Sequence, residues 1–479
     1  MARTWEVPET FLFGPDTAQK DVALDLYSGV ADLGIVAPHG HVNPALLADP
    51  QARFPHPHDL LVRHDHYLFR LLYSQGVPVE ALGVGQQDYD ARAAWQTFCA
   101  HFHLFDGTPS GLWLRLELTR LFGVTEKPCA GNAGALYDQI DALLGTPECT
   151  PRALYRRFGL EVLATTDPVT ADLSQHARAQ ADGFQVVPTF RPDAALHFGH
   201  PDWRANLRAL EEGGGQAIER YATLLDVLRE RRAQFRAHGA RASDHGAARV
   251  NLAPLPGGEA GKLFDLALRG QLTAEQADRL EGHALFDQAR LSAEEDGLVM
   301  QLHLGSVRNH NPLLFQRYGP DMGGDIPQRV NWTAGLRDLL AAFGNHPNFR
   351  AILFTLDEST YARELAPLAG HYPALRLGPP WWFFDSVLGI ERYLDAVTET
   401  ATLHNTAGFN DDTRAFASIP ARHEVWRRTV ANWLARQVLR DLLDLEEARH
   451  LARLTARELA LRAYGFDPPV AAPVLAASR

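Results

Sequence analysis

The segment that most constrains the fold of this chain is 33–43, which reads LGIVAPHGHVN. Its five mostly apolar residues, 33–37, have the length of a strand buried on both faces, as in a parallel sheet. Pro38 ends this strand, and a His-Gly-His sequence follows at 39–41. Because residues two apart in extended chain point the same way, both imidazoles can reach one point in space. The segment therefore predicts half of a divalent metal site of the Zn, Mn or Fe type at the end of a buried strand.

The His-x-His spacing alone is weak evidence for a metal, because the chain contains 21 histidines. The same spacing recurs at 56/58, 64/66 and 101/103. Only the pair at 39 and 41 directly follows the pattern of a buried strand. The context, rather than the spacing, favours metal ligands over structural histidines at this pair.

Short apolar, β-prone runs recur from residue 159 onward, and each ends in a polar cluster. Segments with helical periodicity, such as 203–238, separate most of these runs. With the opening strand, this alternation predicts eight parallel strands, and we expect an α/β fold of the (β/α)8 TIM barrel type. A doubly wound open sheet is the alternative, but no glycine-rich phosphate loop follows the first strand. The expected strands are 33–37, 160–164, 184–188, 241–243, 298–302, 351–356, 375–377 and 407–409.

A long polar and helical region, about 44–158, follows the first expected strand and exceeds the length of a simple return helix. Its amphipathic patterns predict a helical insertion. The segment 420–464 is also expected to be helical and to close the barrel. We therefore expect the whole chain, 1–479, to form one elaborated barrel domain.

Charge and cysteine content limit the partners and the compartment of the protein. A net charge of −12 without any basic run argues against nucleic acid. No stretch approaches the ~18 uninterrupted apolar residues of a membrane span, and the N-terminus does not read as a signal peptide. Three cysteines without metal-ligand spacing fit a reducing compartment. We expect a cytoplasmic protein without nucleic-acid or membrane partners, and a homo-oligomer is compatible with this sequence.

Two further strand ends supply candidate metal ligands. His303 follows the buried run 299–302, although a lone histidine there is more often structural. Asp412 lies at the end of the eighth expected strand, where a turn or helix cap is the ordinary interpretation and Asp411 is the neighbouring alternative. Histidines from strands one and five with an aspartate from strand eight match a recurring mononuclear metal arrangement in barrels.

Charged side chains at other strand ends favour an anionic substrate. Arg191 and Arg414 each follow an expected strand, where the plain interpretation is a surface ion pair. Beside a metal, two arginines would instead stabilise an anion or a developing oxyanion. Asp244 places a carboxylate at a third strand end.

Aromatic residues are also expected near the barrel mouth. Asp65 is predicted to cap a helix, which would let Tyr67 face the mouth. Trp381 begins the aromatic run 381–384, for which core packing is the default interpretation. At the mouth of a barrel, these rings would instead form the wall of a sugar pocket.

The order of these motifs resembles that of the uronate isomerases, a family of the amidohydrolase superfamily. The similarity runs from about Phe11 to Arg428 and departs from the family pattern at three places. The family usually has Asp-Tyr where this chain has Ala-Pro at 37–38, and tryptophan where it has Phe69 and Phe190. The shared motifs are HGH, DHYLFR, TTD, RPD, RASDHG, MQLHLG, SVRNHNP, YGPDMGGD, GPPWWFFD, DDTRAF and RHE.

The resemblance implies an aldose–ketose isomerase that converts D-glucuronate to D-fructuronate and D-galacturonate to D-tagaturonate by proton transfer between C2 and C1. It implies a divalent metal ion, for which we expect zinc, and a small sugar acid as substrate. The implied metal ligands are His39, His41, His303 and Asp412. The implied roles of the other residues are proton transfer by Tyr67 and Asp412, ring opening by Asp244, and contacts to the substrate and enediolate by Arg191 and Arg414, with His66 and Trp381 lining the substrate.

Two other functions remain open from the sequence. The first is a metal-dependent hydrolase or decarboxylase of the same superfamily that acts on a carboxylated substrate. The second is a non-catalytic sugar-acid binding protein. The presence of Tyr67, Asp244 and Asp412 argues against the binding protein, because binding alone does not need a set of proton-transfer groups.

Overall fold

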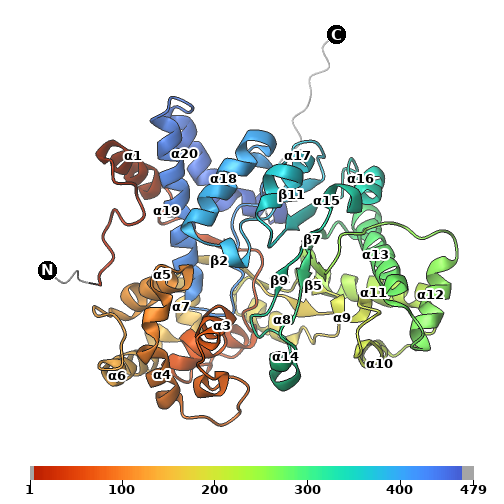
Figure 1. Ribbon diagram of the computed structural model, residues 1–479, viewed down its shortest axis with the longest axis horizontal. Coiled ribbons are helices and arrows are strands. Elements are labelled where there is room, and N and C mark those ends of the chain that lie inside the picture. Colours follow the sequence, from red (N-terminus) through yellow and green to blue (C-terminus); the bar gives the residue numbers. More distant parts are fainter. Residues whose placement is uncertain (1–4, 467–479) are drawn as a thin grey trace.

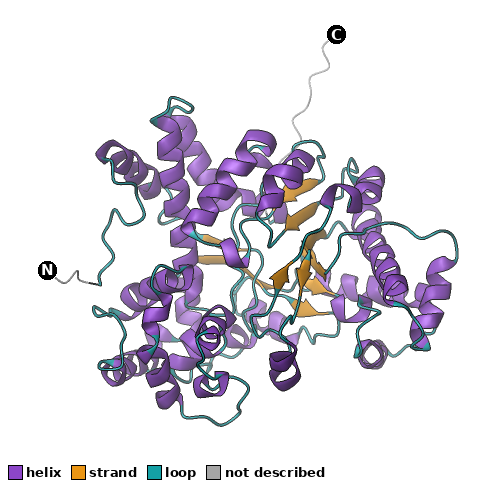
Figure 2. Ribbon diagram, viewed as in Figure 1, coloured by secondary structure: helices purple, strands orange, loops and turns teal. Residues whose placement is uncertain are grey.

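The strands lie at the centre of the molecule and helices surround them (Figure 1, Figure 2). The computed structural model describes residues 5–466. The expected domain 1–479 therefore includes two terminal segments, 1–4 and 467–479, that lie outside the described residues. The strands are β1 (Ile35–Ala37), β2 (Leu160–Ala164), β3 (Asp167–Pro168), β4 (Val186–Val187), β5 (Phe190–Arg191), β6 (Ala242–Ala247), β7 (Val299–Leu304), β8 (Ser306–Val307), β9 (Ile326–Pro327), β10 (Ala351–Phe354) and β11 (Leu375–Leu377).

Parallel pairing follows the expected order around a barrel. One sheet has the order β1-β2-β4, and a second has the order β11-β10-β7-β6-β5-β3. The second expected strand is β2, and the short strand β3 follows it after a break; β4 lies within the third expected strand, and β5 follows it in the same way. Backbone hydrogen bonds continue across the breaks, because the N–H groups of Thr165 and Asp167 donate to the carbonyls of Val187 and Thr189, each at 3.0 Å. The two sheets therefore form one continuous parallel arrangement, to which β8 and β9 add a separate antiparallel pair.

The eighth expected strand, 407–409, is not a regular strand in the structure. This part of the chain makes one parallel bridge, between Leu377 and Thr406. Gly408 has a φ of +72°, which extended strands do not adopt. The barrel is closed by a backbone hydrogen bond from His41 to the carbonyl of Thr413, at 3.0 Å. The seam is therefore made by a loop, because the chain turns at the glycine.

Two other expected strands are longer than the apolar runs that predicted them. Strand β6 continues through Asp244 to Ala247, and β7 continues through His303 to Leu304. These two strands pair in parallel over their whole length, with Gly246 opposite His303. Because the polar residues belong to the strands themselves, their positions are fixed by the sheet.

The expected helical insertion lies between β1 and β2 and gathers on one side of the barrel, at the lower left of Figure 1. Side-chain caps explain several of its helix starts. Asp65 accepts a hydrogen bond from the backbone of Tyr67, Asp90 caps α4, and Thr108 caps α5, which begins with a proline. Its helices are α2 (Ala45–Ala48), α3 (His66–Ser74), α4 (Ala91–Ala100), α5 (Pro109–Leu116), α6 (Ala133–Leu144) and α7 (Pro151–Arg157).

The remaining helices cover the outside of the barrel. The expected helical segment 203–238 is two helices, α10 and α11, because the glycines 213–215 end the first one. Within residues 5–466, no helix is both long and apolar enough to cross a membrane. These helices are α1 (Thr17–Ser28), α8 (Ser174–Ala181), α9 (Asp193–Leu196), α10 (Trp203–Gly214), α11 (Tyr221–Ala237), α12 (Glu259–Leu268), α13 (Ala274–Leu291), α14 (Pro312–Tyr318), α15 (Trp332–Gly335), α16 (Arg337–Phe343), α17 (Ala366–Ala369), α18 (Val387–Ala401), α19 (Ser418–Val438), α20 (Leu445–Arg453) and α21 (Leu459–Tyr464).

Two large hydrophobic cores and one small cluster hold the described layers together. The larger core joins the barrel to its outer helices, and α19 contributes residues such as Trp426 to it. The second core joins the insertion to the first strands, because Ile35 and Leu163 pack with insertion residues such as Trp95. Helix α19 also packs against α1, so the first helix of the described chain lies against its C-terminal helical region.

Candidate active site

A cavity of about 440 Å³ opens where the parallel strands end. This is the end of a barrel at which enzymes of this fold place their chemistry. All ten side chains that the sequence predicts for the site line this one cavity, although their individual roles stay predictions. They are His39, His41, His66, Tyr67, Arg191, Asp244, His303, Trp381, Asp412 and Arg414.

Three of these side chains converge closely enough to hold a metal ion. The Nε2 atoms of His39 and His41 lie 3.3 and 3.0 Å from Oδ1 of Asp412. His39 is buried, and the other two side chains are only partly exposed. Two imidazoles and one carboxylate form a donor set that suits zinc and other transition metals.

His303 extends this group toward Asp244. One potential ligand atom from each of His39, Asp244 and His303 lies within 4.8 Å of the others. The Nδ1 atom of His303 lies 2.6 Å from Oδ1 of Asp244, whereas its buried Nε2 has no hydrogen-bond partner among the described residues. A carboxylate that holds one ring nitrogen fixes the imidazole and leaves the other nitrogen available for a metal.

The surroundings of the cluster favour the protonation states that metal binding requires. Burial would raise the pKa of Asp412, but hydrogen bonds with His39 and His41 outweigh burial and hold this pKa well below its usual value. Burial lowers the pKa of His41 and of His303. Burial acts in the same direction on His39, but the contact with Asp412 outweighs it and raises the pKa, so a bound cation would displace a proton there. The cluster therefore offers an ionised carboxylate and two neutral imidazoles, which are the forms that coordinate a cation.

Three arginines surround the cavity, each paired with a carboxylate. Nη1 of Arg191 lies 3.3 Å from Oδ2 of Asp244, and Nη2 of Arg414 donates to Asp321 at 3.0 Å. Arg308 also lines the cavity and donates to Oδ2 of Asp325 at 2.7 Å. Arg308 is not among the residues predicted from the sequence, although it stands in the motif SVRNHNP. The pocket therefore holds one more arginine than the sequence predicted, together with two further carboxylates, Asp321 and Asp325, that also line the cavity.

Tyr67 is buried beside the metal-ligand candidates at the start of α3. The guanidinium carbon of Arg422 lies 4.6 Å from the centre of its ring and 3.8 Å from that of Trp113. Burial, followed by the negative charge of Asp412, raises the pKa of Tyr67 well above its ordinary value. The phenol is therefore protonated at neutral pH and can donate a proton or a hydrogen bond.

Two more predicted residues complete the aromatic side of the cavity. Burial lowers the pKa of His66 to about 3, so this imidazole is neutral, and its ring stacks on that of Tyr67. Trp381 packs edge-on against His303, with 4.7 Å between ring centres. Trp381 therefore supports a ligand candidate and also forms part of the cavity wall.

Backbone strain is concentrated at this cavity. Seven described residues other than glycine have a positive φ, and four of them line the cavity. These conformations cost about 1–3 kcal/mol each and persist where the surrounding structure enforces them, which is common at functional sites. The four residues are Asn309, Asp321, Trp382 and Asp412.

The structure also shows that polar residues next to the predicted ones do not line the cavity. Asp411 is buried 3.3 Å from Nε2 of His423 and does not line the cavity, whereas Asp412 does. His245 faces Ser243 and is likewise absent from the cavity wall. Within residues 5–466, the His-x-His pairs at 56/58 and 101/103 belong to no group of three metal-ligating side chains.

Residues 9–458 match the model of the glucuronate isomerase family. The chain belongs to this family. A uronate isomerase of Nostoc punctiforme is 52% identical over 460 residues, which cover 95% of this chain and 97% of the relative. A second uronate isomerase, from Rhizorhabdus wittichii, is 48% identical over 455 residues, which cover 95% of this chain and 97% of that relative. Family membership confirms the expected activity class, an aldose–ketose isomerase of uronates, and does not favour the hydrolase or decarboxylase alternative.

Solved structures of glucuronate isomerase family members share the fold. The crystal structure of glucuronate isomerase from Caulobacter crescentus is 44% identical, with a TM-score of 0.95 over 98% of both chains. The uronate isomerase of Thermotoga maritima is 26% identical, with a TM-score of 0.90 over 96% of this chain and 99% of that one. These likenesses confirm the expected (β/α)8 barrel with its helical insertion.

Proposed function

We propose that the protein converts D-glucuronate to D-fructuronate and D-galacturonate to D-tagaturonate by moving a proton between C2 and C1. The observation that carries this proposal is the opposite protonation of two groups in one cavity. Asp412 is ionised and can accept a proton, whereas Tyr67 is protonated and can donate one. An isomerase needs both kinds of group, because the proton that leaves one carbon must be returned to its neighbour.

The proposed ligands of a divalent ion are His39, His41, His303 and Asp412. The neutral imidazoles of His41 and His303, the ionised carboxylate and the unpartnered Nε2 of His303 fit such an ion. Zinc is the proposed identity, because nitrogen and carboxylate ligands suit it. When bound, the ion supplies positive charge that orients the carboxylate end of the substrate.

Binding and ring opening are assigned to the polar wall of the cavity. Arg191 and Arg414 are placed to bind the anionic substrate, and Arg308 adds a third guanidinium on the same wall. Asp244 is proposed to assist opening of the sugar ring, in which the hydroxyl proton on O1 is lost and the ring oxygen gains a proton. His66 and Trp381 are proposed to line the sugar.

In the open-chain sugar, the proton on C2 is acidic because it lies beside the C1 aldehyde. Asp412 is proposed to accept this proton, which leaves an enediolate across C1 and C2. Arg191 and Arg414 remain charged at any working pH and donate hydrogen bonds to the developing oxyanion. Tyr67 is proposed to supply the proton that neutralises the enediolate oxygen O1. Asp412 then returns a proton to C1 as the O2 hydroxyl loses its proton, which restores Tyr67, and the product is the ketose with its carbonyl at C2.

Proton NMR in D2O tests this proposal directly. Metal-loaded protein is mixed with D-glucuronate and, separately, with D-galacturonate. We expect new ketose signals and loss of the C2 proton signal as solvent deuterium enters the sugar. Absence of both changes with both sugars would overturn the proposed substrates, and a product with a broken C–C bond would point to the decarboxylase.

We also propose a cytoplasmic location and a single elaborated barrel domain. The three cysteines are free, which supports a reducing compartment. The shared core between the insertion and the first strands supports one domain. A homo-oligomeric state stays a prediction, which light scattering of the purified protein would test.

A further inference from the structure

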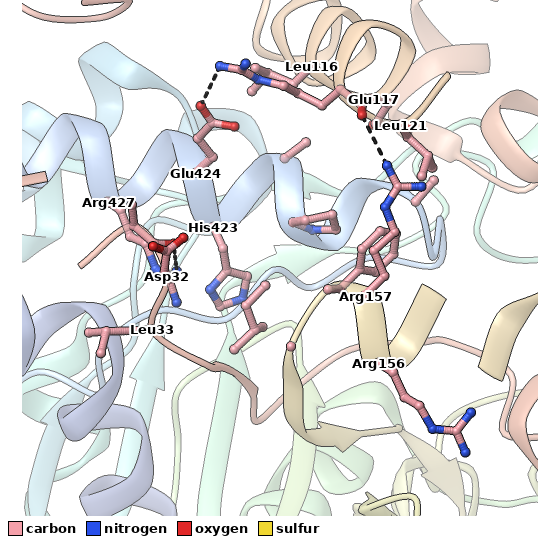
Figure 3. A pocket seen from close by; sticks show the side chains of 18 of the residues that line it. Asp32, Leu33, Leu116, Glu117, Leu121, Arg156, Arg157, His423, Glu424 and Arg427 are labelled. Carbon is pink, nitrogen blue, oxygen red and sulfur yellow. Dashed lines mark hydrogen bonds and ion pairs between the residues drawn. The ribbon is translucent and has the colours of Figure 1, made fainter. Parts of the chain in front are cut away.

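A second cavity, of about 380 Å³, lies outside the barrel at the start of the first two strands (Figure 3). Its walls come from the chain that leads into β1, from the helical turn Glu117–Leu121, from the end of α7 and from α19. Ile35 and Gly159, at the beginnings of β1 and β2, place it at the opposite end of these strands from His39. The two cavities share no lining residue.

Arginines that lack acidic partners line this second cavity. Within residues 5–466, Arg156, Arg157 and Arg427 form no ion pair with a carboxylate. Arg427 donates to two backbone carbonyls, and Arg157 makes one long hydrogen bond, 3.5 Å, to the backbone of Arg120. Arg156 lies over the ring of Phe184, 4.8 Å from its centre. Figure 3 shows the exposed Arg156 side chain turned away from the other lining side chains, so it must rotate to reach an anion in the cavity, whereas Arg157 and Arg427 already face the other lining residues.

The acidic residues of the cavity do not neutralise this charge. Glu424 is shared between Arg120, at 3.4 Å, and Arg428, at 2.8 Å. Burial raises the pKa of Glu117 to about 8, so this side chain is largely uncharged at neutral pH. Asp32 is the other carboxylate of the wall, and its negative charge acts on the guanidinium of Arg427. Arg156 and Arg157 have no ion pair with a carboxylate among the described residues, so the cavity wall is locally positive in a chain whose net charge is −12.

Buried polar atoms in the same wall also lack partners. Oε2 of Glu117 and Nδ1 of His423 have no hydrogen-bond partner among the described residues, and both side chains are at least nine-tenths buried. Both residues line the cavity. A buried polar atom without a partner costs about 1–3 kcal/mol, and a ligand atom that pairs with it removes this cost.

We propose that this second cavity binds a small anion through carboxylate or phosphate oxygens. Its volume is close to that of the catalytic cavity, so a ligand about the size of a sugar acid or smaller fits. Arg156 and Arg157 supply charge at its outer edge, and Arg427 supplies charge at its inner wall. The proposal does not depend on the metal site or on the reaction proposed for the first cavity.

Isothermal titration of the metal-loaded full chain tests this site, with inorganic phosphate and succinate as separate probes. The double variant Arg156→Gln/Arg157→Gln removes two of the charges. Its matched control, Arg208→Gln/Arg269→Gln, removes two exposed arginines that also have no carboxylate partner among the described residues. Binding in the catalytic cavity is common to all three proteins, so the difference between them reports the second cavity.

We expect one binding event to weaken by about tenfold or more in the Arg156→Gln/Arg157→Gln variant and to remain unchanged in the control. Arg156→Lys/Arg157→Lys keeps the charge and should retain most of the affinity. A response to phosphate alone assigns a phosphorylated ligand, and a response to succinate alone assigns a carboxylate. Identical titrations of wild type, double variant and control, or no saturable binding of either probe, would overturn the proposal. If the double variant fails to retain metal, the single variants Arg156→Gln and Arg157→Gln replace it. Weaker binding by either single variant then supports the proposal, and unchanged binding by both overturns it.

Discussion

Opposite surroundings give Asp412 and Tyr67 opposite protonation states within one cavity. Two imidazoles keep the carboxylate ionised, whereas burial and the nearby negative charge keep the phenol protonated. Arg422 moderates the second effect, because its guanidinium lies against the phenol ring and lowers the pKa of Tyr67. The protonation state of each group is therefore determined by its burial and by the charged and polar side chains that contact it.

Replacing Arg414 by lysine tests the division between substrate contact and metal binding. The variant keeps one positive charge but loses the planar fork that can hold two oxygens at once. We expect kcat to fall by about 100-fold while the metal content per chain stays unchanged. Steady-state kinetics and elemental analysis measure the two quantities. Arg440→Lys, at an exposed site, should change neither, and metal loss from Arg414→Lys would contradict the assignment.

Glu117 gives stability a specific dependence on pH. Its folded-state pKa of about 8 lies above the value of an unfolded glutamate, so the unfolded chain ionises first as pH rises. The free energy of unfolding is therefore not reduced by Glu117 near pH 4, and it falls progressively as the pH rises to 8. Glu117→Gln removes this loss, and we expect its Tm to exceed that of wild type by roughly 3 °C at pH 8 and to match it near pH 4.

Glu364→Gln is the matched control for this effect, with the opposite sign. Burial would raise the pKa of Glu364, but hydrogen bonds from Thr333 and Arg363 lower it below its usual value. Its substitution should therefore reduce the Tm at neutral pH. Thermal unfolding of both variants across pH 4–8 separates the two cases, and a Tm difference for Glu117→Gln that does not change with pH would contradict this account.

Among the elements, the barrel seam at 406–413 forms no regular strand, yet it carries Asp412, one of the metal-ligand candidates. Gly408 has a positive φ, and a Cβ there would lie 2.8 Å from the backbone nitrogen of Ala460. The segment is thus held by close packing against the C-terminal helices rather than by a full ladder of hydrogen bonds. Its shape determines where Asp412 lies.

Gly408→Ala tests this packing, with Gly297→Ala as its control. Both glycines have a φ near +70°, but a Cβ at Gly297 would meet open space. Both variants therefore place an alanine in a left-handed backbone conformation, and only Gly408→Ala adds a steric clash with Ala460. We expect Gly408→Ala to lower the Tm by roughly 3 °C more than Gly297→Ala in calorimetry, together with reduced kcat. Equal losses would show that close packing at the seam is unimportant.

The sequence predicts most strands because short apolar runs bounded by polar residues have few other interpretations. It brings the candidate ligands to one cavity because most of them directly follow or lie in such a run, as His303 does, although their role as ligands stays a prediction. It fails at the eighth strand, since the turn at Gly408 depends on contact with Ala460, which no local pattern contains. It also does not predict the break within 203–238, because the periodicity continues past the glycines that end α10.

One group of the site residues that the sequence missed lies on a single loop, whereas others, such as Asp193 and His197, come from α9 and the residue after it. Arg308, Asp321 and Asp325 follow β7 and reach the cavity only because the antiparallel pair β8–β9 folds this loop back. The amino-acid composition of the loop does not predict this fold-back, because the fold-back depends on pairing between residues about 20 positions apart. Their motifs, SVRNHNP and YGPDMGGD, were the available signal.

At the scale of the whole molecule, metal removal tests whether the proposed ion holds the barrel closed. An ion that binds only the folded chain stabilises it by about 4 kcal/mol at a concentration 1,000 times its Kd. We expect prolonged chelation to abolish isomerisation and to lower the Tm by roughly 4 °C, with recovery on adding zinc. His101→Ala/His103→Ala, which changes a pair outside the cluster, should retain the metal. An unchanged Tm after complete metal removal would contradict a structural contribution of the ion.

The closure of the barrel between His41 and Thr413 has a consequence for how the protein is made. A ribosome adds the two histidines long before the aspartate that faces them. A nascent chain halted before residue 412 therefore holds just part of the proposed coordination sphere, and α19 is still missing. Metal capture should then be a late event, and an interrupted polypeptide should release zinc as readily as unstructured chain does.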